Sequence, residues 1–169
     1  MNIMNNRGFS LIELIVVIAI MGTLMTIATL NFNEWQRKVQ IERQTRELFA
    51  DLNQARIDSQ HRKLRHSIVM QPKSYTFRRY SSENESRNAG TVMFTRNVSF
   101  EITRADGTSA ENFITEFDIR GYYNVIDTIL GFDPFRINPV GTAAQVDCII
   151  VATGRTNLGK IENGSCVIK

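Results

Sequence analysis

Glu13 lies near the start of a long apolar run, and its position limits what this chain can fold into. The run continues to Phe32, and no charged side chain occurs between Leu14 and Leu30. A carboxylate inside an apolar segment of bilayer length costs on the order of 2.5–3.5 kcal/mol on insertion scales. The position of Glu13 therefore indicates a cationic partner within an apolar environment.

The residues around Glu13 resemble the class III signal of type IV pilins and of the pseudopilins of type II secretion. The stretch Gly8-Phe9-Ser10-Leu11-Ile12-Glu13-Leu14 fits that signal position by position, and Arg7-Gly8 looks like a processing site. The resemblance implies that a prepilin peptidase cuts between Gly8 and Phe9 and methylates the new N-terminus at Phe9. It also implies that Glu13 pairs with the N-terminal amine of a neighbouring subunit.

An ordinary secretory signal peptide is an alternative interpretation, with Thr26-Ile27-Ala28 as its cleavage site. Against it, Arg7 is the only basic side chain before the run, and Glu13 interrupts the run. The run also exceeds the usual length of about 7–15 residues. A plain membrane anchor is a second alternative, but it has no need for Glu13. We therefore predict a leader peptide at residues 1–8, a transmembrane and filament-core helix at 9–32, and a periplasmic domain at 33–169.

One long helix is predicted from about Phe9 to about Arg62, because no proline interrupts this stretch and Gly22 is its only glycine. Its first half is apolar all round, as a membrane span requires. Its second half carries one stripe at helical spacing, which consists of Ile41, Thr45, Leu48, Leu52, Ala55 and Ser59. The helix is thus expected to be an anchor at one end and a core element at the other.

Strands are predicted after the helix, where runs rich in Val, Ile, Phe, Tyr and Thr alternate with turn residues. These runs lie at residues 66–70, 74–78, 91–95, 98–102, 113–119 and 148–152. Residues 81–90 are expected to form an exposed loop, and residues 127–144 a long loop with a short helix or strand. Asn163-Gly164 is a preferred hairpin turn. A helix followed by strands gives an α+β domain, and the resemblance implies a pilin fold with the long helix packed on antiparallel β-sheet.

Three shorter motifs resemble the GspH/FimT branch of this family, which includes minor pilins and the H-type minor pseudopilin. They are the helix exit at residues 52–60, the strand end Phe117-Asp118-Ile119-Arg120-Gly121, and the apolar strand at 149–155. The resemblance implies a structural subunit that primes a type IV pilus or a type II secretion filament. Its implied partners are other pilins or pseudopilins, the prepilin peptidase and an assembly platform. Its implied location is the bacterial inner membrane, with the C-terminal domain in the periplasm, and later the filament.

Cys148 and Cys166 are the only cysteines, and an even count in an exported domain favours a disulfide. Two arrangements are open. The flanking runs can pair directly, with residues 154–160 as the loop, or the hairpin at Asn163-Gly164 can place a third strand between them. Two sulfurs without a nearby histidine cannot fill a tetrahedral site, so we predict no metal and no cofactor.

Charge is unevenly distributed, with seven Lys or Arg against one acid at residues 55–80 and seven acids against three Arg at 104–147. The basic side fits a neighbouring subunit or an anionic ligand. FimT-type minor pilins bind DNA through a C-terminal Gly-Arg-x-Arg motif, and the corresponding stretch here is Gly154-Arg155-Thr156-Asn157. Asn157 replaces the second arginine, which weakens phosphate binding. The candidate phosphate contacts are Arg155, Lys160, Arg62, Lys63, Arg65 and Arg56.

Enzymatic activity has little support in the sequence. The histidines, His61 and His66, lie in a basic segment where Asp58 is the one acid that could orient them. No Walker-type phosphate loop, Rossmann fingerprint or zinc spacing occurs. We therefore predict a non-enzymatic filament subunit, with a DNA-binding minor pilin as the alternative and an anchored protein that never polymerises as the third candidate.

Overall fold

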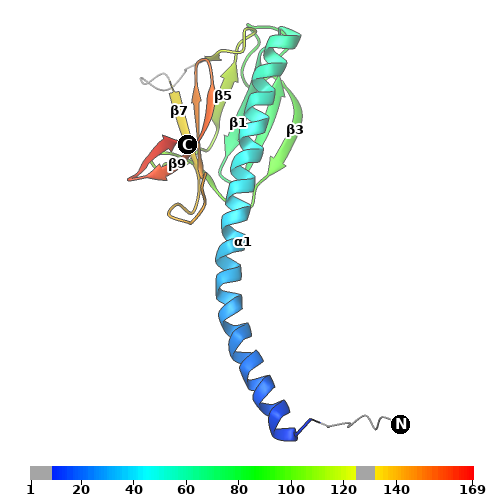
Figure 1. Cartoon of the computed structure of the whole chain (residues 1–169). Coiled ribbons are helices and arrows are strands. Elements are labelled where there is room, and N and C mark those ends of the chain that lie inside the picture. The colour runs from blue at the N-terminus through cyan, green and yellow to red at the C-terminus, as the bar shows by residue number, and fades with distance from the viewer. Residues whose placement is uncertain (1–8, 125–131) are drawn as a thin grey trace, which may run out of the picture. The chain divides into compact units, whose positions relative to one another are not determined.

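The computed structural model describes residues 9–124 and 132–169, with the backbone alone at residues 27–31, 132 and 133. Its described residues form one helix, α1 (Leu11–Arg62), and a series of strands that follows it (Figure 1). The strands are β1 (His66–Gln71), β2 (Ser74–Arg79), β3 (Thr91–Asn97), β4 (Ile102–Arg104), β5 (Phe113–Phe117), β6 (Tyr123–Asn124), β7 (Phe132–Ile137), β8 (Cys148–Ala152), β9 (Thr156–Glu162) and β10 (Ser165–Ile168). By its contacts the chain divides into two units, Met1–Arg37 and Lys38–Lys169.

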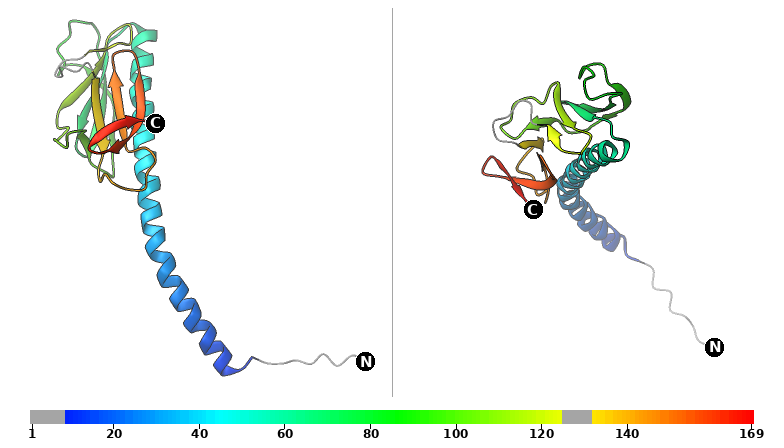
Figure 2. Two further views of the ribbon diagram at one scale, coloured as in Figure 1. Left: turned by 60° about the vertical axis from the view of Figure 1, so that its left-hand side comes forward. Right: turned by 90° about the horizontal axis from the view of Figure 1, so that it is seen from above.

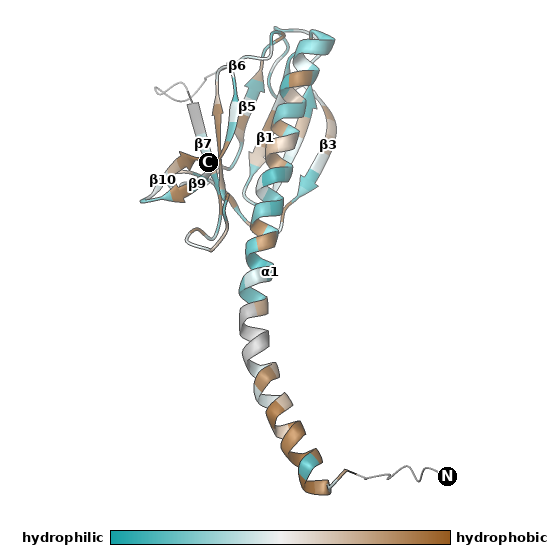
Figure 3. Ribbon diagram, viewed as in Figure 1, coloured by the Kyte–Doolittle hydropathy of each residue, from teal (hydrophilic) through white to brown (hydrophobic). Residues whose placement is uncertain are grey.

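The N-terminal unit is helical from Leu11, and after Glu13 the early turns of the helix are mainly apolar (Figure 3). Residues 14–18 cover more than one full turn, and all five are apolar and exposed. This surface is therefore apolar on every side of the helix, as predicted. By length and mean hydropathy, no helix within the described residues qualifies to cross a membrane. The predicted span at residues 9–32 includes 27–31, whose side chains lie outside the described ones.

The C-terminal unit packs the second half of α1 against two antiparallel sheets (Figures 1 and 2). Sheet A has the order β3-β2-β1-β5-β6, and sheet B has the order β10-β9-β8-β7-β4. All six residues of the predicted helical stripe are fully buried. Its two polar members fit there because the Thr45 and Ser59 hydroxyls donate to carbonyls of their own helix, each at 2.8 Å. The predicted α+β pilin-like fold is confirmed.

One hydrophobic core joins the helix to both sheets. The helix contributes Leu48 and Leu52, which have no exposed surface. Sheet A and sheet B supply the facing side chains, among them Ile68, Phe77, Phe117, Phe135, Ile137 and Ile149. Among the described strands no ladder joins the two sheets, although single backbone hydrogen bonds link them, from the Tyr123 amide to the Thr153 carbonyl at 3.0 Å and from the Ile102 amide to the Pro72 carbonyl at 2.9 Å. The helix α1 contributes side chains to the core that both sheets line.

The predicted strand at residues 98–102 is wrong, because Gln44 on α1 binds the backbone there. The Gln44 side chain donates to the Phe100 carbonyl at 2.6 Å and accepts from the Phe100 amide at 2.9 Å. These are the two groups through which a strand residue would pair with a neighbour. The chain then leaves sheet A, and Ile102 opens β4, which pairs with β7.

Strand β7 lies in a stretch that was predicted mainly as a loop. Pro134 is the residue that counted against a strand there. Proline removes a ladder donor and so counts against a strand inside a sheet. Pro134 pairs with Ile150 of β8 in register, and its carbonyl accepts from Ala105 at 2.9 Å, just past the end of β4. Pro134 thus lacks an amide N–H on the side that faces β4, at a level where β4 has already ended. Residues 127–131 of the predicted loop lie outside the described residues.

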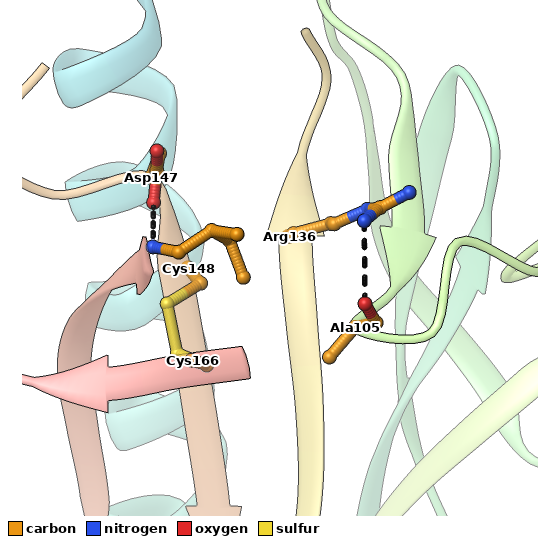
Figure 4. The surroundings of a disulfide bond; sticks show 6 residues. Ala105, Arg136, Asp147, Cys148 and Cys166 are labelled. Carbon is orange, nitrogen blue, oxygen red and sulfur yellow. Dashed lines mark hydrogen bonds between the residues drawn. A yellow bond between two sulfur atoms is a disulfide. The ribbon is translucent and has the colours of Figure 1, made fainter. Parts of the chain in front are cut away.

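Cys148 in β8 and Cys166 in β10 form a disulfide, with β9 between their strands (Figure 4). Of the two arrangements open from the sequence, the protein adopts the three-stranded meander, and Asn163-Gly164 turns with φ of 51° and 80°. The two Cα atoms are 6.0 Å apart. The bond passes over Gly159 of β9, where a Cβ atom would lie 2.8 Å from the Cys166 sulfur and 3.1 Å from that of Cys148.

Replacing Gly159 with alanine should destabilise the oxidised domain, because the added methyl group meets both sulfurs and the Val167 carbonyl. The expected loss is about 1–3 kcal/mol, the usual cost of overpacking. Gly154→Ala is the matched control, since nothing lies within 4 Å of its new Cβ. Urea unfolding of residues 33–169 measures both variants. Equal midpoints for the two would contradict the crossing of the disulfide over Gly159.

Candidate functional site

The N-terminal site is formed by Phe9 and Glu13, while Gly8 lies outside the described residues. Phe9 precedes the helix and is 84% exposed. Glu13 is exposed in the first turn of α1. A negative charge there interacts favourably with the helix dipole and with the unpaired amides of the first turn. Within the described residues, Glu13 forms no ion pair with this chain. The cationic partner predicted for Glu13 stays a prediction.

The surroundings of Glu13 decide how much such a partner contributes. Leu11, Ile12 and Leu14 beside it are apolar and exposed. When these side chains are covered by lipid or by another apolar helix, water leaves and the local dielectric constant falls. Two opposite charges about 4 Å apart then attract by about 4 kcal/mol at an effective dielectric constant of 20, against about 1 kcal/mol in water.

Comparison with protein families supports this description of the N-terminus. Residues 3–29 match the family described as the prokaryotic N-terminal methylation motif. The chain thus carries the N-terminal methylation motif of the type IV pilin and pseudopilin class. The match covers about a sixth of the chain. Comparison with curated proteins gave no match. Comparison with solved structures also gave none.

Arg65, a candidate phosphate contact, is held inside the domain. Its guanidinium lies 4.0 Å from the centre of the Tyr80 ring, and its Nη1 is 3.4 Å from Glu116 Oε1. Its Nη2 donates to the Glu85 carbonyl. Only 8% of Arg65 and 1% of Glu116 are exposed. The prediction that Arg65 contacts DNA phosphates is therefore withdrawn, because its charge already faces a buried carboxylate.

Arg56 is likewise a structural residue. Its Nη2 donates to the Ala152 carbonyl at 3.0 Å, and its guanidinium lies 5.0 Å from the centre of the Phe117 ring. Burial lowers the pKa of Arg56. These contacts tie the last turns of α1 to the end of β8. Arg56 therefore has little surface to offer a phosphate.

Arg155 and Lys160 belong to different surfaces of sheet B. Arg155 and Asn157 line an open, mainly apolar depression with Ile150 and Ile168. Lys160 lines a separate depression with Arg46, Glu162 and Lys169 on the helix-facing side of β9. Arg62 and Lys63 are exposed at the end of α1. The predicted set is thus divided among several surfaces.

His66 is buried and structural. Only 1% of it is exposed, and its Nδ1 lies 2.9 Å from the Leu64 carbonyl and 3.3 Å from the Ser59 hydroxyl. Burial lowers the pKa of His66 below its ordinary value of 6.5. The ring is neutral at pH 7, so its Nδ1 proton goes to the carbonyl. Within the described residues, no group of three or more His, Cys, Asp or Glu could hold a metal ion.

The aromatic pair at the end of the apolar run was not predicted as a functional feature from the sequence. Phe32 and Trp35 lie with ring centres 5.9 Å apart and planes 27° from parallel. They remain 52% and 58% exposed. The signal was present in the sequence, since Trp35 is the only tryptophan and lies three positions after Phe32, where the apolar run ends.

Acidification should destabilise the domain through His66. Because folding lowers its pKa, the unfolded chain binds the proton more tightly, and stability is lost as pH falls below about 6.5. His66→Asn keeps an amide donor near the Leu64 carbonyl and cannot titrate. Urea unfolding at pH 7.5 and pH 5 should therefore show a smaller loss for His66→Asn than for the wild type. An equal loss in both proteins would exclude a contribution from His66.

Duplex DNA should bind residues 33–169 weakly, because Arg155 has neither a second arginine at Asn157 nor Arg65 beside it. The expected Kd is in the non-specific range of about 10⁻⁴ to 10⁻⁶ M and should rise steeply with salt. Gel-shift titration at two salt concentrations measures this. Submicromolar binding that Arg155→Ala abolishes, while Lys160→Ala leaves it intact, would instead indicate a DNA receptor.

Proposed function

We propose that this protein is a minor pilin or pseudopilin, a non-enzymatic structural subunit of a type IV pilus or type II secretion filament. The observation that carries the proposal is the methylation motif at residues 3–29, which includes the start of α1. A prepilin peptidase would cut between Gly8 and Phe9 and methylate Phe9. The subunit would then join or prime the filament with other pilins, drawn from the inner membrane by an assembly platform.

Membrane physics supports this route. From Leu14 to Met25 the large side chains of α1 are apolar and exposed, and lipid or other apolar helices would shield them from water. The packed helices of a filament supply such a cover. Glu13 gains from the same step, since the N-terminal amine of an adjacent subunit gives its carboxylate a partner in a low-dielectric setting.

Within the pilins and pseudopilins, we propose that this protein belongs to the GspH/FimT branch. The three segments that resemble this branch contact one another in the fold, which supports the proposal. The Gln60 side chain donates to the Arg120 carbonyl at 3.0 Å and packs against Gly121, whose φ of 78° suits glycine. Arg56 reaches the Ala152 carbonyl. Residues 52–60, 117–121 and 149–155 thus form one connected end of the domain. A periplasmic location agrees with the Cys148–Cys166 disulfide.

DNA uptake is the alternative function and has less support. Arg56 and Arg65 make internal contacts, and Arg155 and Lys160 line separate depressions. A phosphate backbone needs several cations on one surface to bind tightly. The candidate cations do not provide that arrangement, so filament assembly is the better-supported function.

Processing after Gly8 is the first test of the proposed function. Protein made in a host with prepilin peptidase should give an intact mass for a chain that starts at methylated Phe9. A peptidase-deficient host is the control and should give the uncut chain. A mature start after Ala28, or an uncut chain in both hosts, would remove the basis of the proposal.

Glu13→Val should leave membrane insertion intact but reduce incorporation into filaments to a small fraction of the wild type. The reason is that the variant has no carboxylate for the neighbouring amine, while an uncharged helix enters lipid more easily. Glu34→Val is the matched control, since Glu34 is an exposed acid of the same helix beyond the apolar run. Sheared filament fractions measure incorporation. Equal incorporation of both variants would disprove the pairing role of Glu13.

A further inference from the structure

The aromatic pair Phe32–Trp35 marks the end of the apolar part of α1. The two rings stack on each other at 5.9 Å and are otherwise more than half exposed. Before the pair, the chain is uncharged back to Leu14. After it, Arg37 and Lys38 follow within one turn, and Glu34 lies between the two aromatic residues. The pair therefore lies where an apolar helix becomes a charged one.

Aromatic side chains at such a boundary have a known physical preference. Tryptophan has an apolar ring body and one N–H donor, and it concentrates at the headgroup level of bilayers. Arginine and lysine next to it can extend their side chains to lipid phosphates. The three charges at Glu34, Arg37 and Lys38 sum to +1, which complements phosphate-bearing headgroups.

The spacing along α1 gives a second, independent argument. Glu13 and Trp35 are 22 positions apart on one continuous helix, which corresponds to about 33 Å at 1.5 Å per residue. The hydrocarbon core of a bilayer is about 30 Å thick. With Trp35 at one interface, Glu13 therefore reaches the opposite interface. Its carboxylate then avoids the bilayer centre, where the cost of a charge is highest.

We infer that Phe32 and Trp35 anchor α1 at the lipid headgroups of one leaflet and thereby set the depth of Glu13 at the other. This inference rests on the proposed membrane anchoring of residues 9–32 and adds a role for the aromatic pair. The partner is a phosphate-bearing lipid surface. A neighbouring subunit that covers the same rings in the membrane is the competing occupant, and the experiment separates the two.

The chain's single tryptophan makes the depth measurable, because fluorescence then reports Trp35 alone. The full-length chain is reconstituted at low protein density into vesicles of phosphatidylethanolamine and phosphatidylglycerol. Quenching is compared among lipids labelled near the headgroup, in mid-chain and at the chain end, and with aqueous iodide. We expect a blue-shifted emission relative to the urea-unfolded chain and the strongest quenching from the shallow label.

Two matched variants calibrate the depth. The exchange Phe32→Trp with Trp35→Phe keeps both rings and moves the indole three positions, about 4.5 Å, toward the apolar side. Its quenching should shift to the mid-chain label. Trp35→Phe with Ile57→Trp places the reporter at a 45% exposed position of the second unit. That variant should respond to iodide and not to labelled lipids.

Each outcome decides the inference. Shallow quenching of Trp35, with the exchanged variant deeper, supports the interfacial anchor. Iodide quenching of Trp35, or strongest quenching from the chain-end label, overturns it and leaves membrane anchoring intact. Protection from every lipid label and from iodide, lost on dilution of protein in the bilayer, assigns the rings to a neighbouring subunit and also overturns it. Release of the protein by alkaline carbonate would refute the membrane anchoring itself, and the inference with it.

Discussion

Burial of one stripe of α1 is the constraint on which the folded domain depends. Leu48 and Leu52 contact a core to which both sheets contribute, and the two sheets share no backbone ladder. Each sheet alone would leave one apolar face in water. The stripe must therefore stay helical and in register for both sheets to be covered. Thr45 and Ser59 can be buried in this stripe because each hydroxyl donates a hydrogen bond to a backbone carbonyl of the same helix.

Polar side chains of the helix then fix where the chain crosses between sheets. Gln44 binds both backbone groups of Phe100 at the exit from β3, and Asp51 accepts from Tyr75 at 2.7 Å and pairs with Arg96 at 3.1 Å. Arg56 binds the Ala152 carbonyl at the end of β8, where the chain stays within sheet B. Two of the candidate phosphate contacts, Arg56 and Arg65, are used in such internal contacts. Some of the basic side chains therefore make contacts inside the domain, and only the others are exposed to a ligand.

Local patterns predicted the helix, the buried stripe and the turn at Asn163-Gly164, because neighbours within a few positions decide them. Strands β4 and β7 were harder, since Gln44 acts on Phe100 from 56 positions away and Pro134 is tolerated only where β4 has ended. The candidate site divides in the same way. The methylation motif is contiguous, so it can be recognised from the sequence alone. The role of Arg65 depends on Glu116, 51 positions along the chain, so its burial could not be read from the basic run.

The boundary between the two units has a consequence for assembly. The buried stripe begins at Ile41, after the boundary at Arg37, and none of the described side chains before Ile41 belongs to the core cluster. The described side chains ahead of the boundary are exposed. In the proposed transfer from lipid to a filament, the apolar ones among them would exchange one apolar environment for another. Helix packing and a cationic partner for Glu13 in a low-dielectric setting would then favour the transfer.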